Sequence, residues 1–140
     1  MIGKLFKKGK GDDDSGGSSG DVTLFETTHV LAERAGGVLR ITPKTEMISD
    51  RESKPLQEEV LRAADESGLA TVVLDMKHVG LLASPGIGAL VTLRKTLDGR
   101  GGGLAIYNLS EDIEGVLKIT KLDKMLNVCA TEADAVKAAS

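Results

Sequence analysis

Residue types that could do chemistry gather most closely at 84–88, where the sequence reads Ser-Pro-Gly-Ile-Gly. A serine nucleophile on a tight strand-to-helix turn needs the pattern G-x-S-x-G, so that the backbone can turn on both sides of the serine. Gly86 follows Ser84 at the right spacing, but Leu82 stands where the first glycine belongs. As a dinucleotide-binding loop, the same glycines lack a third, since Val91 occupies its place. The stretch therefore favours neither a serine hydrolase nor a dinucleotide-binding enzyme.

Other residues with reactive side chains are scattered. His29, His78 and Cys129 show no metal-ligand spacing, so no metal site is expected. We interpret His78 as a turn residue, Cys129 as a small buried apolar side chain, and Asp75 as a turn or cap residue. The glycine-rich segment 98–103 is not followed at once by a helix that could bind phosphate, so it is read as a helix stop and loop. The chain is therefore expected to be no enzyme and to hold no cofactor.

Composition narrows the class of protein further. The 140 residues suffice for one ordinary domain, and with 41% hydrophobic but only 2% aromatic residues its core must be aliphatic. A net charge of −3 gives no general attraction to nucleic acid. The single cysteine allows no internal disulfide, which fits a reducing cytoplasm. No apolar run approaches the roughly 20 residues that span a bilayer.

The first 20 residues differ in composition from the rest. Residues 1–10 mix four lysines with Ile2, Leu5 and Phe6, and 12–20 read DDDSGGSSG. This start is not expected to be a signal peptide. It could be a weak membrane-surface anchor, with lysines over anionic lipid, but a solvated, disordered tail and linker is the favoured reading. We therefore divide the chain into a tail at 1–20 and a folded domain at 21–140.

Strands and helices are expected to alternate along this domain. Residues 22–31 and 38–41 predict the first strands, with a turn at 35–37 and a polar loop at 43–53. Further strands are predicted at 71–74, buried on both faces, at 104–109 and at 125–129. Helices are predicted at 55–67, ended by Gly68, and then after Ser84, Ser110 and Thr131 as N-caps. This order predicts an α/β structure with a mixed sheet.

The helix that starts at Ser84 is central to the interpretation. Pro85 is well suited to the first helical position, because its missing N–H would have no partner there. Apolar residues recur at helical spacing in the stretch 87–97, with Arg94 and Lys95 turned elsewhere. A buried strand, an exposed serine-bearing turn and an amphipathic helix thus follow one another.

The order of these elements resembles the STAS domain, the family of anti-sigma factor antagonists and of the cytoplasmic domains of sulphate transporters. The resemblance covers roughly Thr23 to Ala139 and is carried by four motifs, which are strong together in this order: Val73-Leu74-Asp75 followed by Leu82–Leu90, then Gly102–Ile106, Val116–Leu122 and Thr131–Ala135. It implies a four- to five-stranded mixed sheet with about four helices packed mainly on one side.

The resemblance also implies a function by partner switching. In the simplest members of the family, the protein binds an anti-sigma factor that is also a serine kinase of the histidine-kinase-like ATPase type. The kinase phosphorylates the start of the second helix, the complex separates, and a metal-dependent serine phosphatase reverses the modification. A phosphate adds about −1.5 to −2 charges to an interface built for a neutral hydroxyl, which explains the separation.

One departure from the family pattern concerns this switch. Phosphorylated members read D-S-S-G-L-G, with the phosphate on the serine directly before glycine, where this chain has Pro85; the aspartate is replaced by Ala83. Ser84 matches the neighbouring serine. Either Ser84 is phosphorylated in a shifted register, or the domain binds its partner without the switch. An N-cap role, worth about 1 kcal/mol, would explain Ser84 without any kinase.

The expected contact surface is the turn into the second long helix together with the exposed side of that helix: Leu82, Ala83, Ser84, Pro85, Gly86, Ile87, Arg94 and Lys95. The alternative function, suggested by the basic and partly apolar residues 1–10, is a STAS scaffold subunit of a membrane-associated transporter or lipid-transport complex. No nucleic-acid partner is expected in either case.

Overall fold

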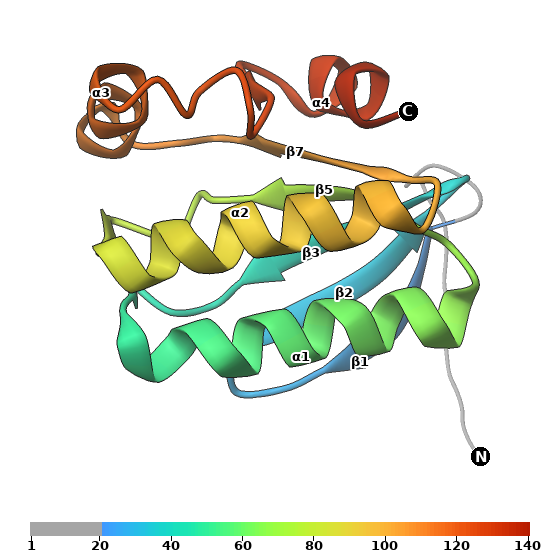
Figure 1. Cartoon of the computed structure of the whole chain (residues 1–140). Helices are drawn as coiled ribbons and strands as arrows, with labels where there is room; N and C mark the ends of the chain where they lie inside the picture. The colour runs from blue at the N-terminus through green and yellow to red at the C-terminus, as the bar shows by residue number, and fades with distance from the viewer. Residues whose placement is uncertain (1–20) are drawn as a thin grey trace.

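A mixed six-stranded sheet forms the centre of the computed structural model, which describes residues 21–140 (Figure 1). Its first three strands are antiparallel, and the third, fifth, seventh and eighth run parallel to one another. In sheet order the strands are β1 (Asp21–Glu26), β2 (Val30–Ala35), β3 (Val38–Pro43), β5 (Thr71–Asp75), β7 (Gly103–Tyr107) and β8 (Val128–Cys129). The expected mixed sheet is confirmed, with more strands than the four or five predicted. The expectations for residues 1–20 lie outside the described residues.

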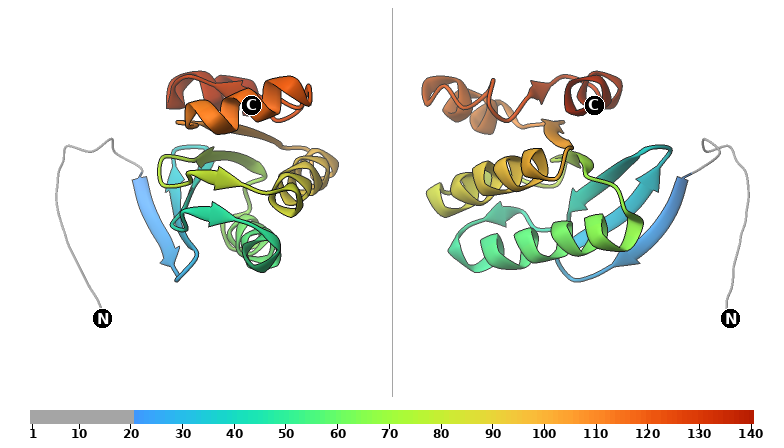
Figure 2. Two further views of the ribbon diagram at one scale, coloured as in Figure 1. Left: turned by 90° about the vertical axis from the view of Figure 1, so that its left-hand side faces the viewer. Right: turned by 45° about the vertical axis from the view of Figure 1, so that its right-hand side comes forward.

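The helices divide unequally between the two faces of the sheet. They are α1 (Asp50–Ser67), α2 (Ser84–Gly99), α3 (Glu111–Ile119) and α4 (Glu132–Ala139). The first three contribute to the larger hydrophobic core, with α1 and α2 side by side across the sheet (Figures 1 and 2). The last helix packs on the opposite face, where Ala135 and Ala139 contact Val73, Ala105 and Tyr107. Helices thus lie mainly on one side, as expected.

A second, very small sheet joins the starts of α1 and α2. Strands β4 (Met47–Ile48) and β6 (Leu81–Leu82) pair in parallel, with Met47 opposite Leu81. The carbonyl of Glu46 accepts hydrogen bonds from the backbone N–H groups of Gly80 and Leu81 at 2.8 and 3.1 Å. Because β4 leads into α1 and β6 into α2, both helices begin at the same end of the molecule, on the left in Figure 1.

Several predicted boundaries are wrong: the last strand is β8 (Val128–Cys129) and not 125–129, and two further errors have clear local reasons. The expected strand at 22–31 is broken, because the Thr27 hydroxyl accepts hydrogen bonds from the N–H groups of His29 and Val30 at 3.1 Å each and closes a turn. The first long helix begins at Asp50 rather than at Pro55. The carboxylate of Glu52 accepts hydrogen bonds from the backbone N–H and the hydroxyl of Ser49, at 3.0 and 2.7 Å, which fixes that earlier start.

Other local predictions are confirmed. The hairpin turns at 35–37, with Gly36 at φ 64°, and Gly68 ends α1 in the left-handed conformation at φ 75°. The side chains of Ser110 and Thr131 accept hydrogen bonds from the third residue of α3 and of α4. The buried core is aliphatic except for Tyr107. None of the helices within 21–140 is both long and apolar enough to cross a bilayer.

Candidate partner-binding site

The start of α2 is held rigidly, but by a different residue from the one expected. The carbonyl of Ala83 accepts the first helical hydrogen bond, from Ile87 at 3.0 Å, while the N–H of Ala83 donates to Ile48 on β4 at 3.0 Å. Ala83 is therefore the N-cap and Ser84 the first helical residue. The prediction of Ser84 as N-cap is wrong, because the bond to β4 directs the chain into the helix one residue earlier.

Gly86 explains why this helix start lies so close to the small sheet. A Cβ atom on Gly86 would lie 2.4 Å from the carbonyl oxygen of Ile48 and 2.9 Å from a methyl carbon of Leu82. Both distances are well inside van der Waals contact, so only glycine permits this approach. A Cβ on Gly88, two residues later, would meet nothing within 4 Å. The glycine at 86 is thus a packing requirement.

The residues predicted to contact a partner divide into three groups by exposure. Ser84, Pro85 and Lys95 are exposed. Ala83, Ile87 and Arg94 are half-buried, whereas Leu82 and Gly86 are buried and can act only by holding their neighbours in place. The structure therefore groups residues 82–87 at the helix start without exposing all of them, whereas Arg94 and Lys95 lie about three turns further along α2.

Arg94 has partners within the chain. Its guanidinium lies 2.9 Å from the carboxylate of Asp98 and donates to the carbonyl oxygen of Met125. These contacts join α2 to the segment before β8, so part of the hydrogen-bonding capacity of Arg94 is used for structure. Lys95 carries no such bond to the residues described at 21–140 and extends into solvent.

Sequence reasoning missed an exposed group of large hydrophobic side chains beside this helix start. Met47, Leu81, Val116 and Ile119 are 42, 55, 43 and 83% exposed, and we call them the apolar patch. The structure explains this exposure, because Ile48 and Leu82 are buried and their neighbours Met47 and Leu81 therefore point the other way; strands of two residues leave no periodic signal for it in the sequence. The patch enlarges the surface available for docking.

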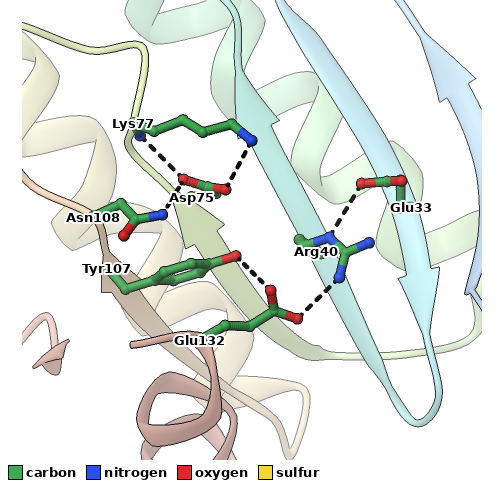
Figure 3. A network of polar contacts seen from close by, with 7 residues as sticks. All are labelled: Glu33, Arg40, Asp75, Lys77, Tyr107, Asn108 and Glu132. Carbon is green, nitrogen blue, oxygen red and sulfur yellow. Dashed lines mark hydrogen bonds and ion pairs between the residues drawn. The ribbon is translucent and has the colours of Figure 1, made fainter. Parts of the chain in front are cut away.

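The opposite face of the sheet carries a polar network of seven residues (Figure 3). Arg40 on β3 lies 3.1 Å from the carboxylate of Glu33 and 2.9 Å from that of Glu132 at the start of α4. The hydroxyl of Tyr107 donates to the same Glu132 at 3.2 Å. At the end of β5, Asp75 completes the network with two further partners, Lys77 and Asn108.

Electrostatics hold two members of this network, Tyr107 and Arg40, each in one protonation state. Burial, reinforced by the charges of Asp75 and Glu132, raises the pKa of the Tyr107 hydroxyl well above its ordinary value. Burial alone would lower the pKa of Arg40, but the two carboxylates outweigh burial and raise it. Tyr107 therefore stays neutral and Arg40 charged at any physiological pH. Five of the network's seven residues line a hollow of about 480 Å³, and each charged group among them has a partner of opposite sign within the chain.

The remaining candidates for chemistry are also placed by the structure. Asp75 is a turn residue, as predicted, since its carboxylate accepts the N–H of Lys77 at 3.1 Å. His78 is exposed in the turn between β5 and β6. Cys129 is only half-buried, and burial raises the pKa of its thiol. Within 21–140, no three His, Cys, Asp or Glu side chains converge as a metal site would require.

Comparison with known proteins identifies the family. Residues 29–135 match the family model of the STAS domain, and the chain belongs to this family.

Similar solved structures include an anti-sigma factor antagonist from Mycobacterium paratuberculosis, with 23% identity over 79% of this chain and 92% of that chain and a TM-score of 0.67. The Bacillus cell fate determinant SpoIIAA in its phosphorylated form matches with 15% identity over 77% of this chain and 96% of that chain, at a TM-score of 0.59. The murine anion transporter Slc26a9 matches with 20% identity over 84% of this chain but 21% of its own, at 0.63. At these identities the likeness shows the fold.

Proposed function

We propose that this chain is a non-enzymatic regulatory protein that acts in the cytoplasm by partner switching with an anti-sigma factor. The partner is a serine kinase of the histidine-kinase-like ATPase type. The observation that carries the proposal is the rigid, exposed start of α2, where Ser84 and Pro85 lie in solvent above β4 and β6. Membership of the STAS family and the similarity to antagonist structures support it.

The geometry suits docking better than catalysis. The first turn of α2 is fixed by the bond from Ala83 to Ile48 and by the close approach of Gly86. A partner can therefore contact Ser84, Pro85 and Ile87 without first ordering a loop, and this lowers the entropic cost of binding. Ser84 forms no hydrogen bond to a base among the residues described at 21–140, as activation of a serine nucleophile would require.

Ser84 is the proposed point of control. Its hydroxyl is exposed at the first position of a 16-residue helix, where a phosphate would be stabilised by the helix dipole and so would not unfold the domain. The same phosphate would bring about two negative charges into the docked surface and separate the partners. The competing hypothesis is constitutive binding, because Pro85 occupies the family's usual acceptor position.

Affinity capture and intact mass test the proposal together. Full-length tagged protein, wild type and Ser84→Glu, is used to capture partners from extract of the source cell. We expect a histidine-kinase-like ATPase with wild type, and at least about tenfold less of it with Ser84→Glu, as for loss of a central contact. Incubation of the captured ATPase with ATP should then add one phosphate to wild type and to Ser140→Ala, but none to Ser84→Ala.

Each outcome separates the hypotheses. A phosphate that persists in Ser84→Ala, or that never forms on wild type, removes the switch and leaves constitutive binding. If no such ATPase is captured and binding is indifferent to Ser84→Glu, the partner-switching function is wrong.

The second candidate function is a scaffold subunit of a membrane-associated transporter complex. Two observations favour it: the basic and apolar composition of residues 1–10 and the STAS-like match to part of an anion transporter. Sedimentation with anionic liposomes, comparing the full chain with residues 21–140, tests it. Binding that depends on the first 20 residues, together with capture of a transporter subunit, supports the scaffold; a full chain that stays in solution contradicts it.

A further inference from the structure

A small pocket opens between β6 and α3, beside the start of α2. It has a volume of about 70 Å³ and is lined by Gly80, Leu81, Leu82, Asp112, Ile113 and Val116. Sites for small-molecule ligands and cofactors usually have volumes of about 300–1,000 Å³. This pocket is far below that range, so its size fits the end of one apolar side chain.

The apolar patch includes two walls of this pocket and the neighbours of those walls. Leu81 and Val116 form part of its wall, Met47 is paired with Leu81 in register, and Ile119 follows Val116 by one helical turn. Ile119 is the most exposed of the large hydrophobic side chains within 21–140, at 83%. Single exposed apolar residues are normal, whereas a connected group around a pocket indicates a protein–protein contact.

Carboxylates without an ion-pair partner lie in and next to the segments that line the pocket, and one of them, Asp112, is part of its wall. Glu111 and Asp112 are exposed in the first turn of α3, and Glu46 is exposed next to Met47; we call these three carboxylates the acidic rim. None of them forms an ion pair with any residue of 21–140, whereas Glu114 lies 3.5 Å from the amine of Lys118. The acidic rim is therefore free to attract a cation and repels anionic lipid.

We propose that this pocket binds one large apolar side chain of a protein partner that carries an arginine or lysine next to it. The inference deepens the proposed function, because the pocket adjoins the helix start to which the partner docks. The apolar side chain fills the pocket and covers Leu81 and Val116. The neighbouring cation lies against Asp112 and Glu111, which fixes the orientation of the partner on the surface.

Peptide selection tests both halves of this proposal. A phage-displayed library of random dodecapeptides is selected on immobilised full-length protein, wild type and Val116→Glu. We expect peptides that bind wild type at least about tenfold more tightly than Val116→Glu, each with a large apolar residue next to arginine or lysine. Peptides selected on Asp112→Lys should carry aspartate or glutamate in place of the arginine or lysine. Peptides selected on Asp112→Asn should keep the large apolar residue but show no charge preference beside it.

Val22→Glu is the matched control, because Val22 is also an exposed valine, at 52%, but lies on β1 at the far edge of the sheet. It should bind the selected peptides as wild type does. Circular dichroism of each variant confirms that it is folded, and Ile119→Glu provides a second probe of the same surface. Absence of Val116-dependent peptides, or peptides without a cationic preference, overturns the proposal.

Two other occupants are also distinguished. If vesicles of phosphatidylcholine and phosphatidylserine bind wild type but not Val116→Glu, the surface is a membrane contact. If wild type forms a dimer that Val116→Glu does not form, the surface is a contact between two copies of the chain. Both results overturn the proposal.

The pocket and the proposed function can also fail separately. Capture of the ATPase by Val116→Glu at the wild-type level refutes the pocket and leaves the proposed function intact. Selective peptides without any captured ATPase would support the pocket and refute the proposed function.

Discussion

The two faces of the sheet use polar and apolar side chains in opposite ways. On the face under α4, Arg40 has carboxylates from β2 and from α4, and Tyr107 donates to the same Glu132. On the other face, at the start of α2, the apolar patch is left in solvent and the acidic rim has no cation within the described chain. The charged groups on the first surface are paired within the chain, whereas the second surface leaves apolar side chains and carboxylates without partners.

This difference separates a structural surface from a binding surface. Matched charges and hydrogen bonds leave a partner little to gain, because it would have to replace contacts that already exist. Exposed apolar side chains gain free energy when a partner covers them, and unpaired carboxylates attract a partner that supplies a cation. The density of charged side chains alone would favour the polar network and its larger hollow as a binding site. The presence of exposed apolar side chains and of carboxylates without ion pairs favours the smaller pocket.

The strongest test of the comparison uses two isoleucines on α3. Ile113 is 3% exposed and Ile119 is 83% exposed. Ile113→Ala should lower the free energy of unfolding by about 2–4 kcal/mol, because it leaves a cavity in the core, whereas Ile119→Ala should change it by less than about 0.5 kcal/mol. Urea denaturation measures both. A large loss in Ile119→Ala would show that the apolar patch serves stability instead of binding.

A second pair of substitutions tests how rigidly the helix start is held. Gly86→Ala should cost about 1–3 kcal/mol of stability, because its Cβ would collide with the carbonyl of Ile48. Gly88→Ala, with open space around it, should gain about 0.5–1 kcal/mol through lower unfolded-state entropy. Thermal and urea unfolding compare the two. Equal effects would mean that α2 can move away from β4, and partner binding by Gly86 variants should be interpreted only after their stability is known.

Removal of a carboxylate tests the opposite face. Glu132→Ala should lower the free energy of unfolding by about 1 kcal/mol, because Tyr107 and Arg40 each lose a hydrogen-bond partner while Arg40 keeps Glu33. Glu114→Ala, which removes an exposed pair one turn apart, should cost about 0.3–0.5 kcal/mol. Peptides selected by the pocket should bind Glu132→Ala unchanged. A loss of that binding would join the two faces into one functional unit.

The smallest expected effect concerns pH at the start of α1. Hydrogen bonds from the side chain and the backbone of Ser49 lower the pKa of Glu52 below its ordinary value. A lowered pKa in the folded state gives stability that is present above the unfolded-state pKa and is lost as pH falls through the folded-state pKa. The stability difference between wild type and Glu52→Gln should therefore narrow on acidification below about pH 4.

Unfolding by urea at several pH values measures this narrowing, with Glu58→Gln on the same helix as the matched control. A difference that stays constant down to the most acidic folded condition would contradict the assignment of the capping hydrogen bonds. Such a result would also leave the early start of α1 without its local cause.

Features of the fold that depend on neighbouring residues could be predicted from the sequence, whereas features that depend on contacts between distant segments could not. Gly68, Ser110 and Thr131 act within a few residues of themselves, so their roles as caps were predictable. Strands β4 and β6 have two residues each, which is too short for any periodicity, and their pairing depends on segments far apart. The N-cap at Ala83 depends on the same pairing, because its N–H bonds to β4.

The helix start was predictable in position, but the exposure of the residues around it was not. The helix start at 84–88 was found from residue types, whereas the burial of Leu82 and the exposure of Leu81 follow from which way a two-residue strand faces. The ion pair between Arg40 and Glu132 spans 92 residues, and no spacing rule in one sequence relates such positions. The Ser49–Glu52 capping box, by contrast, is a local signature of the sequence, within a stretch whose polarity also suits a loop.

The aromatic content has one practical consequence for following this molecule in solution. The chain has a single tyrosine and no tryptophan, so Tyr107, 2% exposed, dominates its intrinsic ultraviolet emission. That ring lies under α4, on the side remote from the proposed contact. Its emission should change when the last helix undocks or the whole domain unfolds. Binding of a ligand beside α3 should leave the Tyr107 emission unchanged, so such binding must be followed by a chromophore on the ligand.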